Sequence, residues 1–219
     1  MLENVQAFLF DFDGTLIHQE IDFDLMRRRV LELMARYGVD ADQYGRLYLL
    51  ELIERVAAHL DEEGGNRGQA FVQEAQQAIT EVELEAAERA EAFPGVPEML
   101  HRLRDAGFGI GIVTRNCRVA VERVMARHGL IYDILLTRDD VPFVKPDPRH
   151  LLAALEALRA PGERAAMCGD HPMDVVAGQR VGARTVGILP PGKSAEFFAA
   201  VSPDLILSDV TDILGYVAQ

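Results

Sequence analysis

Short apolar runs separated by segments of helical period make up the beginning and the second half of the chain. Short apolar runs bounded by turn residues are typical of buried strands. They lie at residues 5–10, 108–114, 134–137, 165–169, 185–189 and 205–207. Helical spacing is found between several of them, at residues 118–128, 148–158 and 174–181. Strands that alternate with helices of this length predict an α/β fold, a doubly wound parallel sheet covered by helices on both faces.

Residues 21–92 have a different pattern. This stretch contains no proline, and its apolar positions recur at helical spacing near residues 25–34, 47–57 and 71–90. Residues 18–93 hold 8 arginines against 17 acidic residues, so the stretch is also strongly acidic. We therefore predict an all-helical domain at residues 18–93, inserted into an α/β core made of residues 1–17 and 94–219.

The acidic composition of the chain restricts which partners it can bind. The 219 residues carry 22 basic and 35 acidic side chains, a formal net charge of −13. Nucleic-acid affinity comes largely from basic residues that neutralise phosphates, so neither nucleic acid nor an anionic membrane is expected as a partner. The first residues lack the basic and apolar regions of a signal peptide, and no apolar run is long enough to span a membrane. A cytoplasmic location is expected, where Cys117 and Cys168 stay reduced.

Polar side chains follow the predicted strands, at the sheet edge where such folds bind ligands. These residues are Asp11, Asp13, Thr114, Arg115, Asn116, Lys145, Asp170 and Asp174. Carboxylates brought together need a cation, and aspartate oxygens without His or Cys favour Mg²⁺ over zinc. The repulsion among Asp11, Asp13, Asp170 and Asp174 therefore predicts a magnesium site at this edge, in which Asp170 can hold the metal and Asp174 can hold it directly or through water.

The spacing of Asp11 and Asp13 has a chemical meaning. Side chains two residues apart leave the same face of an extended strand end. One carboxylate can then attack an electrophile while the other moves a proton. The hydroxyl of Thr114 can donate to an anionic oxygen, and Lys145 can neutralise developing negative charge.

Four segments resemble the motifs of the haloacid dehalogenase-like hydrolase superfamily. They are Asp-Phe-Asp-Gly-Thr-Leu from residue 11, Val-Thr at 113–114, Lys-Pro-Asp-Pro from 145 and Gly-Asp-His-Pro-Met-Asp from 169. They occur in the order of that superfamily, and the resemblance covers nearly the whole chain. The nearest subgroup is the phosphoglycolate phosphatase-like enzymes. The resemblance implies that residues 18–93 are a helical cap that covers the site and excludes polymer substrates.

The resemblance also implies a mechanism. Asp11 is then the nucleophile that forms an aspartyl-phosphate, and Asp13 is the general acid and base. Thr114 and Lys145 bind the transferring phosphoryl group. Mg²⁺ is held by Asp11, the backbone carbonyl of Asp13 and Asp170, with Asp174 as outer support. We therefore predict a Mg²⁺-dependent phosphatase acting on a small-molecule phosphate ester.

Several points stay open at this level. Arg115 and Asn116 differ from the small or uncharged residues expected after the motif threonine. Both can contact substrate, and Asn116 can equally cap the next helix. His171 is interpreted as a loop residue rather than a metal ligand. Phosphoglycolate, a sugar phosphate, a nucleoside monophosphate and pyrophosphate all remain possible substrates, and the chain can be a monomer or a homodimer.

Three functions other than a phosphatase are compatible with some of the same residues. A phosphomutase shares all four motifs and is the main alternative. A haloacid dehalogenase is disfavoured by Asp13, because that chemistry needs no proton-transfer carboxylate there and no metal. A non-catalytic regulatory protein is disfavoured because every motif residue is intact.

Overall fold

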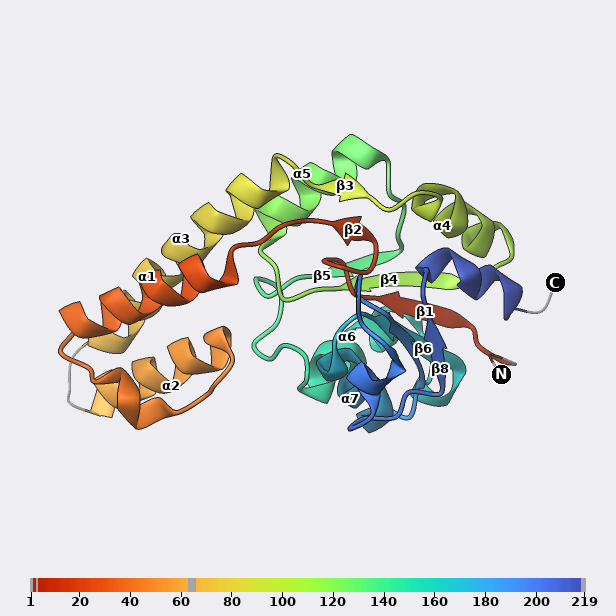
Figure 1. The fold of residues 1–219 in the computed structure, drawn as a ribbon. Coiled ribbons are helices and arrows are strands. Elements are labelled where there is room, and N and C mark those ends of the chain that lie inside the picture. The colour runs from red at the N-terminus through yellow and green to blue at the C-terminus, as the bar shows by residue number, and fades with distance from the viewer. Residues whose placement is uncertain (1, 3, 63–65, 218–219) are drawn as a thin grey trace. The chain divides into compact units, whose positions relative to one another are not determined.

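The computed structural model describes residues 2, 4–62 and 66–217, and it divides the chain into two compact units (Figure 1). One unit is Met1–Gln19 with Ala90–Gln219, and the other is Glu20–Arg89. The predicted helical insertion, residues 18–93, extends a few residues further at both ends. The difference arises because the short strands β2 (Ile17–His18) and β3 (Glu91–Ala92) pair antiparallel within the first unit.

A six-stranded sheet forms the centre of the first unit. Its order is β5-β4-β1-β6-β7-β8, and every neighbouring pair is parallel. The strands are β1 (Ala7–Phe10), β4 (Gly109–Val113), β5 (Ile134–Leu136), β6 (Ala165–Gly169), β7 (Arg184–Ile188) and β8 (Leu205–Leu207). All four residues of β1 are buried, as expected for a central strand covered on both faces. The predicted α/β class is confirmed.

Four helices connect these strands. They are α4 (Val96–Asp105), α5 (Arg118–His128), α6 (Pro148–Leu158) and α7 (Pro172–Arg180). Short 3₁₀ helices follow at Gly162–Arg164, Ala195–Phe198 and Val210–Gly215. Helix α7 begins two residues earlier than predicted, because Pro172 suits the first helical turn and His171 caps it. In residues 2, 4–62 and 66–217, no helix is long and apolar enough to cross a membrane.

Within residues 20–62 and 66–89, the regular secondary structure of the second unit is helical. It contains α1 (Phe23–Arg36), α2 (Leu49–Glu62) and α3 (Arg67–Ala87), with a 3₁₀ helix at Ala41–Tyr44. The apolar faces of the three long helices meet in one core, in which Val30, Leu52 and Phe71 are buried. Leu47 lies just before α2 rather than inside it, but it packs against the same core.

Candidate active site

The central position of β1 determines which loops meet. Phe10 at the end of β1 lies opposite Ile112 of β4 and Cys168 of β6. All three strands run in the same direction, so the residues that follow them emerge side by side at one edge. The backbone N–H of Asp11 also donates to the Cys168 carbonyl at 2.9 Å, which fixes the start of the first loop.

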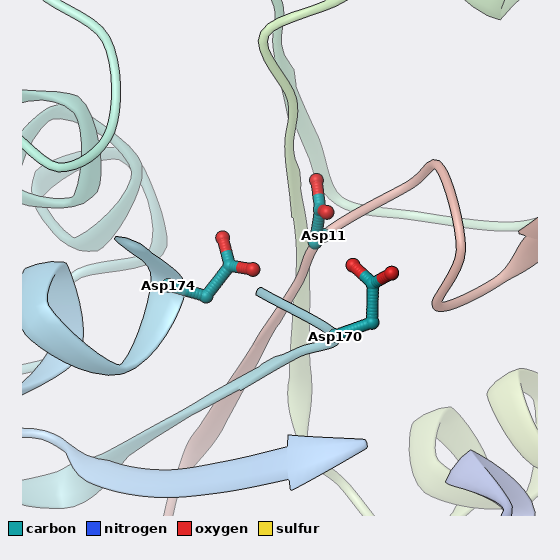
Figure 2. A group of neighbouring side chains, drawn as sticks. All are labelled: Asp11, Asp170 and Asp174. Atoms are coloured by element: carbon teal, nitrogen blue, oxygen red, sulfur yellow. The ribbon is translucent and has the colours of Figure 1, made fainter. Parts of the chain in front are cut away.

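Three carboxylates face one another at this edge, as Figure 2 shows for Asp11, Asp170 and Asp174. Each offers one oxygen, and these oxygens lie within 4.8 Å of one another. Asp174 is buried, and the other two are half-buried. A group made only of carboxylate oxygens fits a hard cation such as Mg²⁺, as predicted.

Burial and mutual repulsion change the proton affinity of this group. Burial raises the pKa of Asp170 to about 8, and the charges of Asp11 and Asp174 add to the effect. Burial likewise raises the pKa of Asp174, against the opposing influence of Lys145. The carboxylates therefore retain a proton near neutral pH when no cation is bound. A divalent cation can replace that proton, because it stabilises the ionised form of every carboxylate it contacts.

Lys145 is the protein's own cation in this cluster. Its Nζ lies 2.7 Å from Asp11 Oδ1 and 2.7 Å from Asp174 Oδ1, and its side chain is only 1% exposed. Burial opposes the charged ammonium, but the two carboxylates outweigh it and raise the pKa of Lys145 above its ordinary value. Lys145 is therefore charged and neutralises Asp11 directly.

Two neighbours hold the backbone that carries Lys145. The guanidinium of Arg115 donates to the Lys145 carbonyl, and the Lys145 N–H donates to Nδ1 of His150 at 3.2 Å. Burial, together with the charge of Lys145, lowers the pKa of His150 to about 3. The imidazole is therefore neutral, so Nδ1 accepts and Nε2 donates to the Leu136 carbonyl, 3.3 Å away.

Asp13 has quite different neighbours from Asp11. Its carboxylate accepts hydrogen bonds from Thr114 Oγ1 at 3.2 Å, Gln19 Nε2 at 2.9 Å and Asn116 Nδ2 at 3.1 Å. These three hydrogen bonds come from neutral side chains, and Asp11 is the aspartate that contacts Lys145. Two aspartates that lie two residues apart in sequence thus occupy different environments, as acid–base and nucleophilic roles require.

The side chain of Asp13 is not one of the three clustered carboxylates. If Asp13 is a metal ligand, the backbone carbonyl is the group placed to act, as the motif resemblance implied. Gly14 brings this backbone close to the cluster: a Cβ on Gly14 would lie 2.2 Å from Oδ2 of Asp170. Its φ of +80° also favours glycine, so the turn after Asp13 depends on this residue type.

Asp174 joins the cluster to helix α7. Its Oδ2 accepts the backbone N–H of His171 at 3.1 Å, and His171 Nδ1 accepts the Met173 N–H at 3.1 Å. These two bonds form a reciprocal cap at the start of the helix. His171 is therefore a capping residue in this loop, in line with its interpretation from the sequence.

Sequence reasoning did not identify two residues of the site. Gln19 was counted within the helical insertion, and nothing in its local pattern indicated a contact with Asp13. His150 lies inside α6, where only the folded structure brings it against Lys145. Their proximity in space to Asp11–Asp13 and to Lys145 is the signal that identifies them.

The helical unit has a cavity of its own, with a volume of about 440 Å³. It is lined by Gln43, Tyr44, Leu47, Arg55, Ala58, His59 and Glu62. None of these residues belongs to the carboxylate cluster. The candidate catalytic residues therefore lie at the sheet edge of the first unit and not in this cavity.

Comparison with known proteins gives consistent matches over most of the chain. A family model described as haloacid dehalogenase-like hydrolase matches residues 5–182. A pyrophosphatase, PpaX, of Bacillus mycoides (strain KBAB4) is 32% identical over 218 residues, covering 98% of each chain. A second PpaX, of Bacillus cereus (strain G9842), is also 32% identical and covers 98% of this chain and 97% of its own.

A solved structure also shares the fold. The crystal structure of a predicted phosphoglycolate phosphatase from Haemophilus somnus 129PT has a TM-score of 0.66 and 18% identity, with 99% of each chain covered. At this level of identity, the match concerns the fold alone.

The carboxylate cluster gives a first prediction, on stability without metal. Because the folded state raises the pKa of Asp170 to about 8 from 3.8, the folded protein holds a proton that the unfolded chain releases. That contribution is complete below about pH 4 and is lost as the pH rises through 8. In a chelator, the wild-type melting temperature should therefore fall between pH 6 and pH 8. For one proton the change is about 1.4 kcal/mol per pH unit at most.

Asp170→Asn should flatten this pH dependence and should be more stable than wild type at pH 8 in chelator. Added Mg²⁺ should stabilise the wild type and have little effect on the variant. Thermal unfolding at pH 6, 7 and 8 measures both, and Asp105→Asn, which removes an exposed carboxylate outside the cluster, is the control. Parallel curves for wild type and Asp170→Asn would contradict the prediction.

Proposed function

The chain belongs to the haloacid dehalogenase-like hydrolase family, and on that basis we propose that it is a Mg²⁺-dependent phosphatase working through an aspartyl-phosphate on Asp11. One observation carries the proposal. Asp11 lies against the buried cation Lys145 and beside two further carboxylates, while Asp13 lies outside that cluster and accepts hydrogen bonds from Thr114, Gln19 and Asn116. This arrangement separates a nucleophile from a proton-transfer group within three residues.

Asp11 is suited to attack phosphorus because its charge is offset. Lys145 holds one oxygen of Asp11 at 2.7 Å and so fixes the side chain as well as reducing its repulsion of a phosphate. When bound, Mg²⁺ supplies further positive charge to the nucleophile and to the phosphoryl oxygens. The groups that would hold it are Asp11, Asp170 and the carbonyl of Asp13, with Asp174 beside them.

The proposed reaction has two steps, formation of the aspartyl-phosphate and its hydrolysis. The Asp11 carboxylate forms a bond to phosphorus as the bond to the leaving oxygen breaks, and Asp13 gives its proton to that oxygen. Water next attacks the phosphorus of the aspartyl-phosphate and passes a proton to Asp13. This step releases inorganic phosphate and restores both carboxyl groups.

Thr114 and Lys145 are proposed to hold the transferring phosphoryl group. Thr114 is fully buried at the end of β4, and its Oγ1 accepts the backbone N–H of Asn116 at 3.0 Å. The hydroxyl itself donates to Asp13 Oδ2 at 3.2 Å, and we propose that it donates to the phosphoryl group instead when substrate is bound. The guanidinium of Arg115 donates a hydrogen bond to the carbonyl of Lys145. It therefore supports the lysine proposed to bind the phosphoryl group, whether or not it also contacts substrate.

The substrate is proposed to be a small phosphate compound. The Bacillus relatives are named pyrophosphatases, which makes pyrophosphate the first compound to test. Phosphoglycolate, sugar phosphates and nucleoside monophosphates complete the set. The helical unit, Glu20–Arg89, is proposed to act as the cap that selects among them and excludes water.

Phosphate release from this set of compounds, with and without Mg²⁺, tests the function. We expect turnover with Mg²⁺, none in excess chelator and little with Ca²⁺, since Ca²⁺ prefers more ligands at looser distances. Identifying the products separates phosphatase from mutase, because a mutase returns an isomeric phosphosugar. Full turnover in chelator, or no release from any compound, would overturn the proposal.

Lys145→Ala should lower kcat by about 10²–10³ fold, the usual effect of removing one electrostatic donor at a reacting group. The matched control is Lys193→Ala, because Lys193 is the only other lysine of the sequence and is exposed. Steady-state kinetics on both variants, with thermal unfolding to confirm that they fold, gives the comparison. Equal activity of the two variants would mean that Lys145 has no role in turnover.

Asp11→Asn and Asp13→Asn should impair different steps of the reaction. Asp11→Asn should form no phosphoenzyme and show no turnover. Asp13→Asn should form phosphoenzyme more readily from an aryl phosphate than from an alkyl phosphate, because a good leaving group needs less protonation. Its phosphoenzyme should then break down slowly with both, since water still needs a base.

Rapid quench with labelled substrate measures both steps. Phosphoenzyme in Asp11→Asn, or equal losses for the two substrates at the first step in Asp13→Asn, would show that the roles are assigned wrongly.

A further inference from the structure

We propose that Asn116 is a positioning residue that orients the carboxylate of Asp13 for proton transfer. This inference rests on the proposed function, in which Asp13 is the acid and base. From the sequence, Asn116 was open to two interpretations, a substrate contact or a helix cap. Its surroundings in the structure favour a third role.

The contact between the two side chains is direct. Asn116 Nδ2 lies 3.1 Å from Oδ1 of Asp13 and 3.3 Å from Oδ2. A donor placed between both oxygens of a carboxylate restrains its rotation, which a donor to one oxygen alone does less well. Asn116 itself is only 3% exposed, so water does not readily replace this bond.

The orientation of the Asn116 amide follows from its second hydrogen bond. Its Oδ1 accepts the backbone N–H of Cys117 at 2.8 Å. A backbone N–H needs an acceptor and a carboxylate needs a donor, so only one of the two amide orientations satisfies both partners. The NH₂ group therefore faces Asp13, and the side chain is fixed at both ends.

Two other side chains donate hydrogen bonds to Asp13. Thr114 donates to Oδ2 at 3.2 Å and Gln19 donates to Oδ1 at 2.9 Å. Neither bridges the two oxygens in the way that Asn116 does. Thr114 is also the residue proposed to bind the phosphoryl group, so Asn116 and Gln19 can continue to hold Asp13 when substrate engages the threonine.

Position matters for Asp13 because it acts on two different oxygens in turn. It protonates the leaving oxygen first and deprotonates water afterwards. A misplacement of about 1 Å in such a group can cost about 10²-fold in rate. Asn116 would thus affect the rate through Asp13 without touching the substrate.

The test compares Asn116→Leu and Asn116→Ser with wild type in rapid-quench experiments. Leucine removes both hydrogen bonds at similar size. Serine is too short to reach Asp13, but its hydroxyl can still accept the Cys117 N–H, so it is the matched control for folding. Thermal unfolding in Mg²⁺ confirms that each variant is folded.

Both variants should form phosphoenzyme about 10- to 100-fold more slowly from an alkyl phosphate. The loss should be smaller with a nitrophenyl phosphate, and KM should stay within about twofold of wild type. A raised KM with equal losses for the two substrates would show instead that Asn116 contacts the substrate, and would overturn the inference.

A double variant makes the test sharper. If Asn116 acts only through Asp13, Asp13→Asn with Asn116→Leu should be no slower than Asp13→Asn alone. Multiplicative losses would contradict the inference while leaving the phosphatase function standing. A wild-type protein that forms no phosphoenzyme at all would overturn the proposed function and this inference together.

Discussion

The close approach of Asp11, Asp170 and Asp174 is the constraint on which the rest of the site depends. Their oxygens lie within 4.8 Å of one another, although like charges at such distances repel strongly. The parallel sheet imposes this approach, because β1 and β6 are neighbours and deliver Asp11 and Asp170 to the same edge. Lys145 offsets part of the repulsion. The proposed Mg²⁺ would offset what remains.

This arrangement links stability to function. A folded state that holds unbalanced carboxylates is destabilised unless a proton or a cation is present. In the proposed mechanism, the same electrostatic cost would favour binding of the cation that helps to accept the phosphate. The side chain of Asp13 is not part of this carboxylate cluster, and it accepts hydrogen bonds from Thr114, Asn116 and Gln19. This separation from the cluster is what the proposed acid–base role of Asp13 requires.

The sequence predicted much of the first unit, because local signals coincide with the ends of its elements. Helix α5 ends at His128 because Gly129 takes up the left-handed conformation that closes it. Helix α6 begins at Pro148, which suits the first helical turn. Helix α4 was not predicted, although it has an apolar face and a proline in its first turn. Strand β1 is shorter than predicted, since Val5 and Gln6 precede the paired residues.

The contacts within the site could be anticipated only as far as their common sheet edge. The strand-end positions of Asp11 and Asp170, and the position of Lys145 just before a helix, indicated that the three converge, but not which atoms meet. The bond between Asn116 and Asp13 joins residues 103 positions apart, and local pattern holds no information on such a pair. The pairing of Gln19 with Asp13 was hidden for another reason. Two-residue strands at 17–18 and 91–92 place Gln19 in the first unit, and strands so short leave no periodic signal.

The central claim, that Asp11 becomes covalently phosphorylated, is tested most directly by locating the phosphoryl group. Protein quenched during turnover with Mg²⁺ can be treated with borohydride, which reduces an aspartyl-phosphate to homoserine, and the peptides can be identified by mass spectrometry. The account predicts homoserine at position 11 and unchanged aspartate at positions 13, 170 and 174. Homoserine at another of these positions, or an unmodified Asp11 in a protein that is turning over substrate, would contradict it.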